Sequence, residues 1–578
     1  MDIPRLDRLH GSVHHVYVAG KPFLIRGGEV HNSSFSSAKH MKPIWDQLVK
    51  NNLNTILGPV SWEGIEPTEG SFDFSWLDQI ILDARSHQLK LILLWFGAHK
   101  NGEYNGDRDH DAVCSSTLGT GVYAPSWVKR DRKRFPRAET LVDGTPSINT
   151  TLSVFASETI EADATAFGAL MAHLKIFDSG KYTVIMVQVE NEVGLMGDSR
   201  DRSGLAERRF AENVPTSLLE MLKLREGKMS PAFKRNFPSP GSDYKPNQSW
   251  DDTFGKSEST DELFMAYYYA TYCEAVANRG TQAYPLPLYT NAALRNDPLW
   301  LVGVAQEISG IGGGVRPGLY PTGGPVETVL DIWHYFAPTL QFLAPDIYLN
   351  DYPETCRLYS HGDQPLFIPE QRRDEYGDLR IWEAIGTYNA IATSPFGIDT
   401  DSPMTSPFTH HYELIKKFSG IILRARTKGY DMCGFFFDRY ERSQPNPSPG
   451  REVKMGDWHL HIKRAHTFGQ PDPGFGIVIR TSANNFLLLG EGYSVGFDRV
   501  IPAGKDPVFT GLIGFWEKGV TNEETGELET LRTLNGDEVG NGSWAIMASA
   551  TIDLGGFCIP AFIPAKTRIA EVEVYFLD

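Results

Sequence analysis

Long apolar runs separated by helical patterns are the feature that most constrains the fold. Residues 89–96 read LKLILLWF, and residues 184–189 read VIMVQV. Neither run alternates between apolar and polar side chains, which is typical of strands buried on both faces of a parallel sheet. Between them, residues 164–177 repeat apolar side chains at helical spacing. The pattern therefore predicts an α/β architecture in which helices cover both faces of a sheet.

The same alternation of strand and helix recurs over the first part of the chain. Strands are predicted at residues 23–26, 54–60, 89–96, 184–189, 286–290, 342–348, 366–369 and 389–394. About eight such units is the count of a (β/α)8 or TIM barrel, whose chemistry lies at the carboxyl ends of the strands. We expect this barrel to occupy residues 1–425, with a polar insertion at about 198–260 after the fourth strand.

The pattern changes from about residue 429 onward. Helical periodicity disappears, and short alternating runs are separated by Gly, Pro and Asn. Such runs predict a smaller antiparallel, β-sandwich-like domain at residues 426–578. Sugar binding, support of the barrel and dimerisation all fit a domain of this kind, so a homo-oligomer stays open.

Composition argues against several classes of partner. The 578 residues include 55 Lys+Arg and 72 Asp+Glu, a formal net charge of −17. Nucleic-acid and anionic-membrane partners depend on basic patches, so neither is expected. No stretch approaches the roughly 20 apolar residues that span a bilayer.

Cysteine usage and the first residues bear on the compartment. The five cysteines are widely spaced and form no CxxC pair, which argues against a zinc ribbon and favours a reducing compartment. No apolar signal segment is visible at the N-terminus, so the expected location is the cytoplasm. A leader outside the printed chain would instead indicate secretion.

Two glutamates fall at the ends of predicted strands. Glu192 follows the fourth strand directly after Asn191, and Glu370 ends the seventh. A glycosidase needs two such carboxyl groups, one to protonate the leaving oxygen and one to attack the anomeric carbon or activate water. The alternative is that each glutamate caps a helix or pairs with an arginine, and Arg372 and Arg373 directly follow Glu370. Two glutamates on separate strand ends favour catalysis, and burial with mutual repulsion is expected to raise the pKa of the acid.

Four blocks of sequence, in order, resemble glycoside hydrolase family 35, the β-galactosidases, within the clan of (β/α)8 retaining enzymes. Residues 187–194 (VQVENEVG) are similar to the family's QxENExG segment, and 366–371 (LFIPEQ) to its nucleophile segment. Upstream, 28–31 (GEVH) resembles the first-strand GEIH segment, and 62–74 is similar to a W…EP…G.fdF block. The resemblance covers most of residues 22–400.

This resemblance implies a role for each matching residue. Glu192 would be the acid/base, Glu370 the nucleophile, Asn191 a ligand of the sugar 2-OH, and Tyr348 a hydrogen-bond donor to the nucleophile, while Glu190 would be structural. The implied activity is a retaining exo-β-glycosidase that needs no cofactor and no metal. Retention places the two carboxyl groups about 5–5.5 Å apart.

The resemblance specifies the sugar less closely than the reaction type. Residues 96–102 (FGAHKNG) replace the family's PYICAEW segment, and Asn101 stands where a galactose-binding Glu would fall. A terminal β-galactoside is the first expectation, and β-glucoside, β-fucoside and α-L-arabinopyranoside stay open. Further substrate contacts are predicted, with the two tryptophans as stacking platforms: Glu29, His31, Trp62, His99, Asn101 and Trp127.

Two hypotheses from other classes remain. A barrel protein that binds carbohydrate without catalysis would keep the same strand ends. A serine hydrolase could use Ser494, because residues 492–496 match G-x-S-x-G. That elbow needs a helix after the serine, and the residues that follow predict another strand, so a turn in the C-terminal domain is the preferred interpretation.

Overall fold

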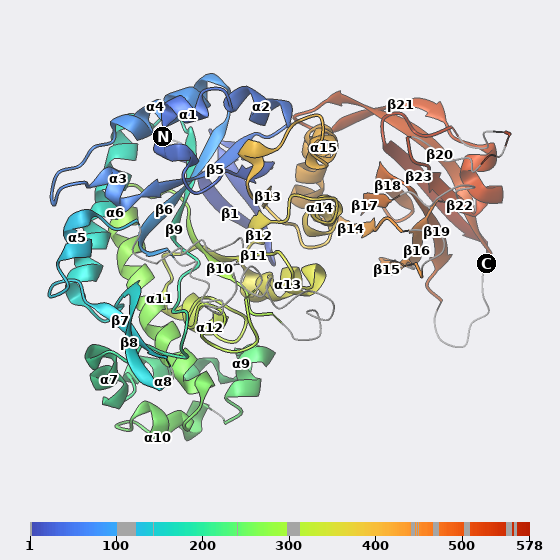
Figure 1. Cartoon of the computed structure of the whole chain (residues 1–578). Coiled ribbons are helices and arrows are strands. Elements are labelled where there is room, and N and C mark those ends of the chain that lie inside the picture. The colour runs from blue at the N-terminus through green and yellow to red at the C-terminus, as the bar shows by residue number, and fades with distance from the viewer. Residues whose placement is uncertain are drawn as a thin grey trace.

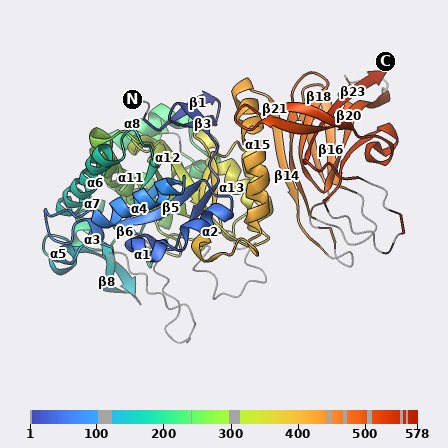
Figure 2. The same ribbon diagram turned by 90° about the horizontal axis from the view of Figure 1, so that it is seen from above.

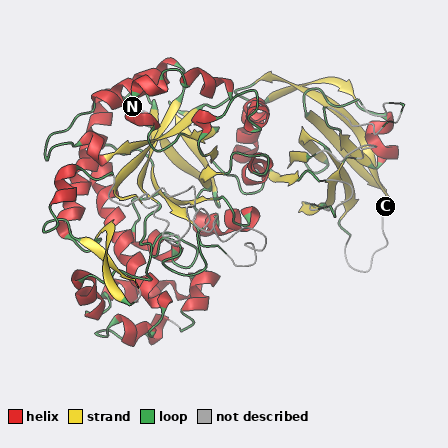
Figure 3. Ribbon diagram, in the orientation of Figure 1, coloured by secondary structure: helices red, strands yellow, loops and turns green. Residues whose placement is uncertain are grey.

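A computed structural model describes residues 3–100, 123–142, 144–239, 241–296, 313–440, 445–446, 448, 450–465, 473–501, 509–550, 556, 558–559 and 563–577. A helix-covered barrel and an all-β part lie side by side, with α14 (Gly377–Gly386) and α15 (Phe408–Lys428) between them (Figure 1). Strands occupy the centre of the first part and helices its outside (Figure 3). The predicted fold class, a TIM barrel followed by an antiparallel β domain, is confirmed.

Eight parallel strands close the barrel. In order around it they are β4 (Gly27–Glu29), β5 (Thr55–Ser61), β6 (Lys90–Lys100), β9 (Val184–Asn191), β10 (Leu288–Ala293), β11 (Phe342–Asp346), β12 (Phe367–Gln371) and β13 (Ala392–Pro395). Parallel bridges from Ile347 to Gln371 and from Glu29 to Phe396 join the ends of the six-stranded sheet to the β12–β13 pair. The carboxyl ends of all eight strands therefore meet at one face.

Helices surround this barrel: α1 (Ala38–Met41), α2 (Trp45–Lys50), α3 (Trp62–Ile65), α4 (Ser75–Ser86), α5 (Ser126–Arg130), α6 (Ser157–Phe177), α11 (Glu258–Ala283), α12 (Leu330–Phe336), α13 (Tyr352–Tyr359), α14 and α15. Local chemistry sets several of their ends. Ser257 caps α11 by accepting the backbone N–H of Thr260, and Gly429 ends α15 with a φ of 65°, which glycine adopts without strain.

Smaller elements decorate the barrel. They are the antiparallel strands β1 (Arg5–His10), β2 (Val13–Val18) and β3 (Lys21–Phe23), the hairpin β7 (Arg137–Val142) and β8 (Thr145–Leu152), and four helices between β9 and α11, namely α7 (Gly204–Ala211), α8 (Thr216–Arg225), α9 (Pro231–Asn236) and α10 (Trp250–Phe254). Among the described residues, no helix is both long and apolar enough to cross a membrane.

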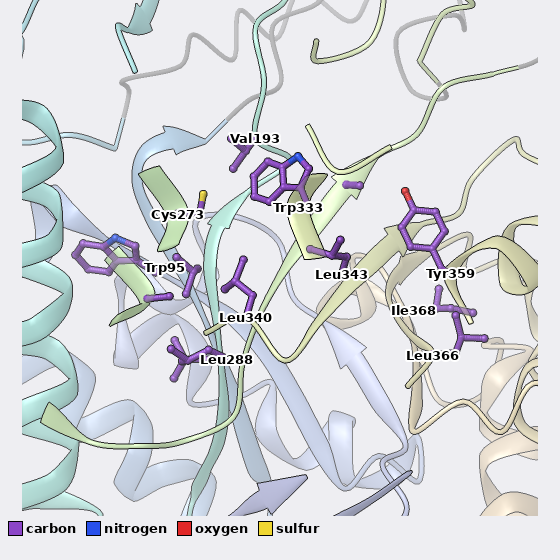
Figure 4. Close-up of a cluster of buried hydrophobic side chains, with 14 of the residues drawn as sticks. Trp95, Val193, Cys273, Leu288, Trp333, Leu340, Leu343, Tyr359, Leu366 and Ile368 are labelled. Atoms are coloured by element: carbon purple, nitrogen blue, oxygen red, sulfur yellow. The ribbon is translucent and has the colours of Figure 1, made fainter. Parts of the chain in front are cut away.

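The position of strand β6 between two packed layers explains why its sequence is apolar without alternation. Ile92, Leu94 and Phe96 belong to a cluster that fills the barrel, whereas Leu91, Leu93 and Trp95 belong to the layer between barrel and helices. Figure 4 shows part of that outer layer, including Trp95. Both faces of the strand are thus buried, and each large apolar side chain contributes about 1.5–3 kcal/mol on burial.

The C-terminal part is a two-sheet antiparallel sandwich. One sheet has the order β14 (Asp431–Phe437), β17 (Gly474–Arg480), β18 (Asn485–Glu491), β23 (Ile569–Leu577), β20 (Phe509–Asn522) and β21 (Glu527–Thr533); the other has β15 (Arg451–Met455), β16 (Trp458–Arg464), β19 (Tyr493–Arg499) and β22 (Trp544–Met547). Trp458, Phe486 and Val495 belong to the core that the sandwich encloses.

The two parts pack through α14, and the view from above shows α15 at the same boundary, between the barrel and β14 (Figure 2). Every residue of α14 is buried, because barrel and sandwich cover opposite sides of it. Trp382 stacks on Phe475 of β17 with 4.8 Å between ring centroids. Arg380 pairs with Asp438 at 2.8 Å. The sandwich is therefore held on the barrel by a buried aromatic contact and an ion pair.

Candidate active site

The chain turns sharply where β9 reaches the barrel face. Glu190 and Glu192 have φ angles of 60° and 48°, a left-handed conformation that is unusual for residues with a side chain. The backbone N–H of Glu192 donates to Oδ1 of Asn291 at 2.8 Å. The Glu192 side chain keeps 19% of its surface exposed. Backbone strain of this kind concentrates at functional sites, where surrounding contacts maintain it.

Glu370 lies on β12, almost fully buried. Its Oε2 accepts a hydrogen bond from the Tyr348 hydroxyl at 2.6 Å. The adjacent arginines turn elsewhere: Arg372 pairs with Asp374 at 3.0 Å, and Arg373 donates to Thr400 at 2.6 Å. The ion pair that could have made Glu370 merely structural is therefore not formed with either neighbour.

Three carboxyl groups meet at this face. One oxygen from each of Glu192, Asp346 and Glu370 lies within 4.8 Å of the others. This upper limit on the distance between oxygens is close to the carboxyl separation of about 5–5.5 Å in retaining glycosidases and well below the roughly 6.5–9.5 Å of inverting ones. The same oxygens are hard ligands that could hold a metal ion such as Mg²⁺ or Ca²⁺. An ammonium group already reaches this cluster, because Nζ of Lys100 lies 3.7 Å from Glu192 Oε2.

Asn291, on β10, connects the cluster. Its amide nitrogen lies 2.8 Å from Asp346 Oδ2, 3.2 Å from Asn191 Oδ1 and 3.4 Å from Glu370 Oε1, while its oxygen accepts the Glu192 N–H. Gln188 also donates to Asn191 Oδ1 at 2.8 Å. Asn291 and Asp346 were not predicted from the sequence, because neither lies in a recognisable motif and only their place at strand ends could have suggested them.

Burial and mutual repulsion keep protons in this cluster. Burial and the charge of Glu192 raise the pKa of Glu370 to about 7, although Lys100 and the Tyr348 hydrogen bond oppose the rise. Burial, and then repulsion from Glu370, raises the pKa of both Glu29 and Asp346 well above the usual range. A carboxyl cluster that still holds protons near neutral pH can supply one to a leaving group.

Lys100 ends β6 and lies in the chain between His99 and Asn101, two residues that the sequence suggested as substrate contacts. Burial alone would lower the pKa of its ammonium group, but the surrounding carboxylates, Glu192 first, raise it, so Lys100 stays charged. The Nζ atom also lies 5.1 Å from the centroid of the Phe96 ring. Alternation along β6 does not by itself place Lys100 in the site, because the pairing of β6 with β9 shifts register between Trp95 and Lys100.

Three predicted substrate contacts lie elsewhere. His99 is fully buried against α11, with ring centroids 4.6 Å from Tyr272 and 5.3 Å from Tyr269. Trp62 is also fully buried, and its indole N–H donates to Glu66 at 2.8 Å. Trp127 meets Trp62 edge-on at 5.8 Å. His99 and Trp62 thus expose no ring face in this structure, and Trp127 packs against Trp62, so contact of these three residues with a sugar stays a prediction.

Other predicted residues divide between the site and its surroundings. Glu29 and Asn191 lie in the cluster, with Glu29 coupled electrostatically to Glu370. His31 is tied to Asp399 by a 2.7 Å contact and keeps 42% of its side chain exposed. Asn101 lies outside the described residues.

Glu190 supports the strand ends instead of joining the catalytic pair. It accepts the backbone N–H groups of Ala98 and His99 at 3.2 and 2.8 Å. Ser494 lies inside strand β19, which runs on to Arg499 without a helix. The strand–turn–helix context of a serine nucleophile is therefore missing at that position.

Comparison with known proteins gives two family matches. A family model described as "Beta-galactosidase", that of glycoside hydrolase family 42, matches residues 36–95. A second, described as "Domain of unknown function (DUF5597)", matches residues 408–546. A search of curated proteins finds no match. The first matched segment runs from α1 to β6 and ends before either Glu192 or Glu370.

Among solved structures, the chain is similar to a β-galactosidase from Bacillus circulans sp. alkalophilus (15% identity, 69% of this chain and 57% of that one, TM-score 0.43). It is also similar to a β-galactosidase from the psychrophilic Marinomonas ef1 (13%, 69% and 60%, 0.43) and to the catalytic domain of a β-amylase from Paenibacillus polymyxa (12%, 65% and 92%, 0.42). The chain thus spans less than two thirds of the length of these β-galactosidases, and TM-scores this low say nothing about activity.

The sequence match at residues 36–95 is the informative comparison. It supports the expected clan of retaining barrel enzymes but names family 42, and family 35 finds no support. The chain is thus similar to β-galactosidases of family 42 over residues 36–95.

Proposed function

We propose that the protein is a retaining exo-β-glycosidase that removes a terminal β-linked galactose. The observation that carries the proposal is the short separation of Glu192 and Glu370, which follow β9 and lie on β12 of the barrel and have oxygens within 4.8 Å of each other. A gap of this size leaves no room for the water that an inverting enzyme holds between its carboxyl groups.

In the first step, Glu370 attacks the anomeric carbon while Glu192 protonates the glycosidic oxygen. Hydrogen bonds from Tyr348 and Asn291 stabilise the ionised form of Glu370, the form that attacks. In the second step, Glu192 deprotonates a water molecule that releases the sugar from Glu370. Asn191, whose Nδ2 has no partner among the described residues, is available to the sugar 2-OH.

The first experiment is a panel of nitrophenyl glycosides. We expect β-D-galactoside to be cleaved faster than β-D-glucoside, β-D-fucoside or α-L-arabinopyranoside, and NMR should detect the β-anomer as the first product. An α-anomer would contradict retention. Absence of cleavage of every member would instead support the barrel protein that binds carbohydrate without catalysis.

Two variants separate the roles of the carboxyl groups. Glu370→Ala should lose turnover, and azide should restore it with formation of the α-glycosyl azide. Glu192→Ala should keep more activity on dinitrophenyl than on alkyl leaving groups, because a good leaving group needs no protonation, and azide should give the β-azide. Wild-type rates in Glu370→Ala would show that the nucleophile is misassigned.

A further inference from the structure

Lys100 carries hydrogen-bond donors that no described residue uses. Its side chain is only 9% exposed, and its nearest carboxylate oxygen, on Glu192, is 3.7 Å away. That distance permits electrostatic attraction but is too long for a hydrogen bond. An ammonium group has three N–H donors. Charge attraction alone therefore holds Lys100 at the carboxylates, which leaves its N–H donors available to a bound ligand.

Other polar atoms of the same cluster are also unpartnered among the described residues. They are both carboxyl oxygens of Glu29, Nδ2 of Asn191 and Oδ1 of Asp346. All belong to residues with at most 2% exposure. Donors and acceptors are therefore mixed around Glu192 and Glu370, which suits a ligand whose groups can both donate and accept. Sugar hydroxyls have this property.

We propose that Lys100 is a substrate-binding residue that donates hydrogen bonds to a hydroxyl of a neutral terminal sugar. The inference rests on the glycosidase proposed above and specifies which sugars that site takes. Lys100 ends β6, the third barrel strand, so a cationic donor lies beside Glu192 at the barrel face.

The surrounding charge favours a neutral sugar over an acidic one. Glu29, Glu192, Asp346 and Glu370 all interact electrostatically within the cluster, and Lys100 is the cation that opposes them. A uronic acid would add a fifth carboxyl group, and like charges in a buried site repel strongly. A hydroxyl accepts from Lys100 without that repulsion.

The test compares Lys100→Met with the wild type on nitrophenyl β-galactoside and its 2-, 3-, 4- and 6-deoxy analogues. Loss of a hydrogen bond to a charged group should lower kcat/KM by about 10- to 100-fold on the parent sugar. On the one analogue that lacks the bonded hydroxyl, the two enzymes should differ by less than about threefold. Lys90→Met is the matched control, because Lys90 begins the same strand and donates to Tyr182.

Equal losses on all five substrates, accompanied by a shifted pH profile, would overturn the proposal and show that Lys100 only tunes the carboxylates. Preference of the wild type for nitrophenyl β-glucuronide would overturn the neutral-sugar part. Lys100→Gln, which keeps a donor without the charge, should recover part of the loss and guards against a folding defect in Lys100→Met.

Failure of the glycosidase proposal would be seen separately. If the wild type cleaves none of these substrates, binding of free galactose, glucose and fucose by calorimetry still tests Lys100. Binding that Lys100→Met weakens at least tenfold supports the inference, whereas equal binding, or no binding of any of the three sugars by the wild type, refutes it.

Discussion

The hydrogen bond between Tyr348 and Glu370 makes the clearest quantitative prediction. Its 2.6 Å length and the burial of Glu370 make it a strong bond to a charged group, worth about 1.5–3 kcal/mol. The bond lowers the pKa of Glu370, against burial and Glu192, which together raise it to about 7. Tyr348→Phe removes the donor with little change in shape, so the pKa of Glu370 should rise further.

The assay is the pH dependence of kcat/KM on an aryl β-galactoside. Glu370 must be ionised to attack, so activity is lost as the pH falls through its pKa, and the acidic limb should move upward by about 1–2 pH units in Tyr348→Phe. Tyr352→Phe is the control, since Tyr352 is a buried tyrosine nearby but donates to Gln371 at 2.8 Å. An acidic limb that stays in place in Tyr348→Phe, or moves downward, would refute the assignment of Glu370 as the ionised nucleophile.

Three further outcomes are expected. Asn291→Ala removes the acceptor of the Glu192 N–H and should lower kcat about 100-fold with unchanged circular dichroism; a loss below threefold would contradict the role of Asn291 in positioning. Burial and Asp163 raise the pKa of Glu190, so the free energy of unfolding should fall as the pH rises above about 4.5. Urea unfolding at pH 5 and at pH 8 measures this fall. The difference between the two pH values should be smaller in Glu190→Gln, because its amide replaces the protonated acid. Trp382→Ala opens a cavity against Phe475 and should lower the free energy of unfolding by about 3–5 kcal/mol in the same assay. A loss below about 1 kcal/mol would contradict the packing of Trp382 on Phe475.

The barrel was predictable because burial on both faces leaves a local mark. The apolar runs of β6 and β9 need no knowledge of their partners, since any strand between two packed layers must avoid polar side chains. Glu192 and Glu370 were predictable for a related reason: a carboxyl group that directly follows such a run has to emerge at the strand end.

The remaining members of the site depend on how the strands close. Asn291 and Asp346 lie on separate strands, more than fifty positions apart, and each looks unremarkable in its own segment. Their contact arises because barrel closure brings the ends of six strands, β4, β6, β9, β10, β11 and β12, around one point. His99 and Lys100 show the same dependence: they are neighbours in the chain, yet the first packs against α11 and the second lies beside Glu192.

The tryptophans show in another way what the sequence alone could not predict. A ring in a loop after a strand can cover a sugar or cover the core, and the residue type serves both purposes equally well. Trp62 and Trp127 pack against each other because α3 and α5 lie side by side around Glu66. Hydrophobic periodicity depends on residues that are close in the sequence, so it can be read from the sequence alone. The tertiary neighbours of a side chain come from distant segments, and those contacts exist only once the barrel has closed.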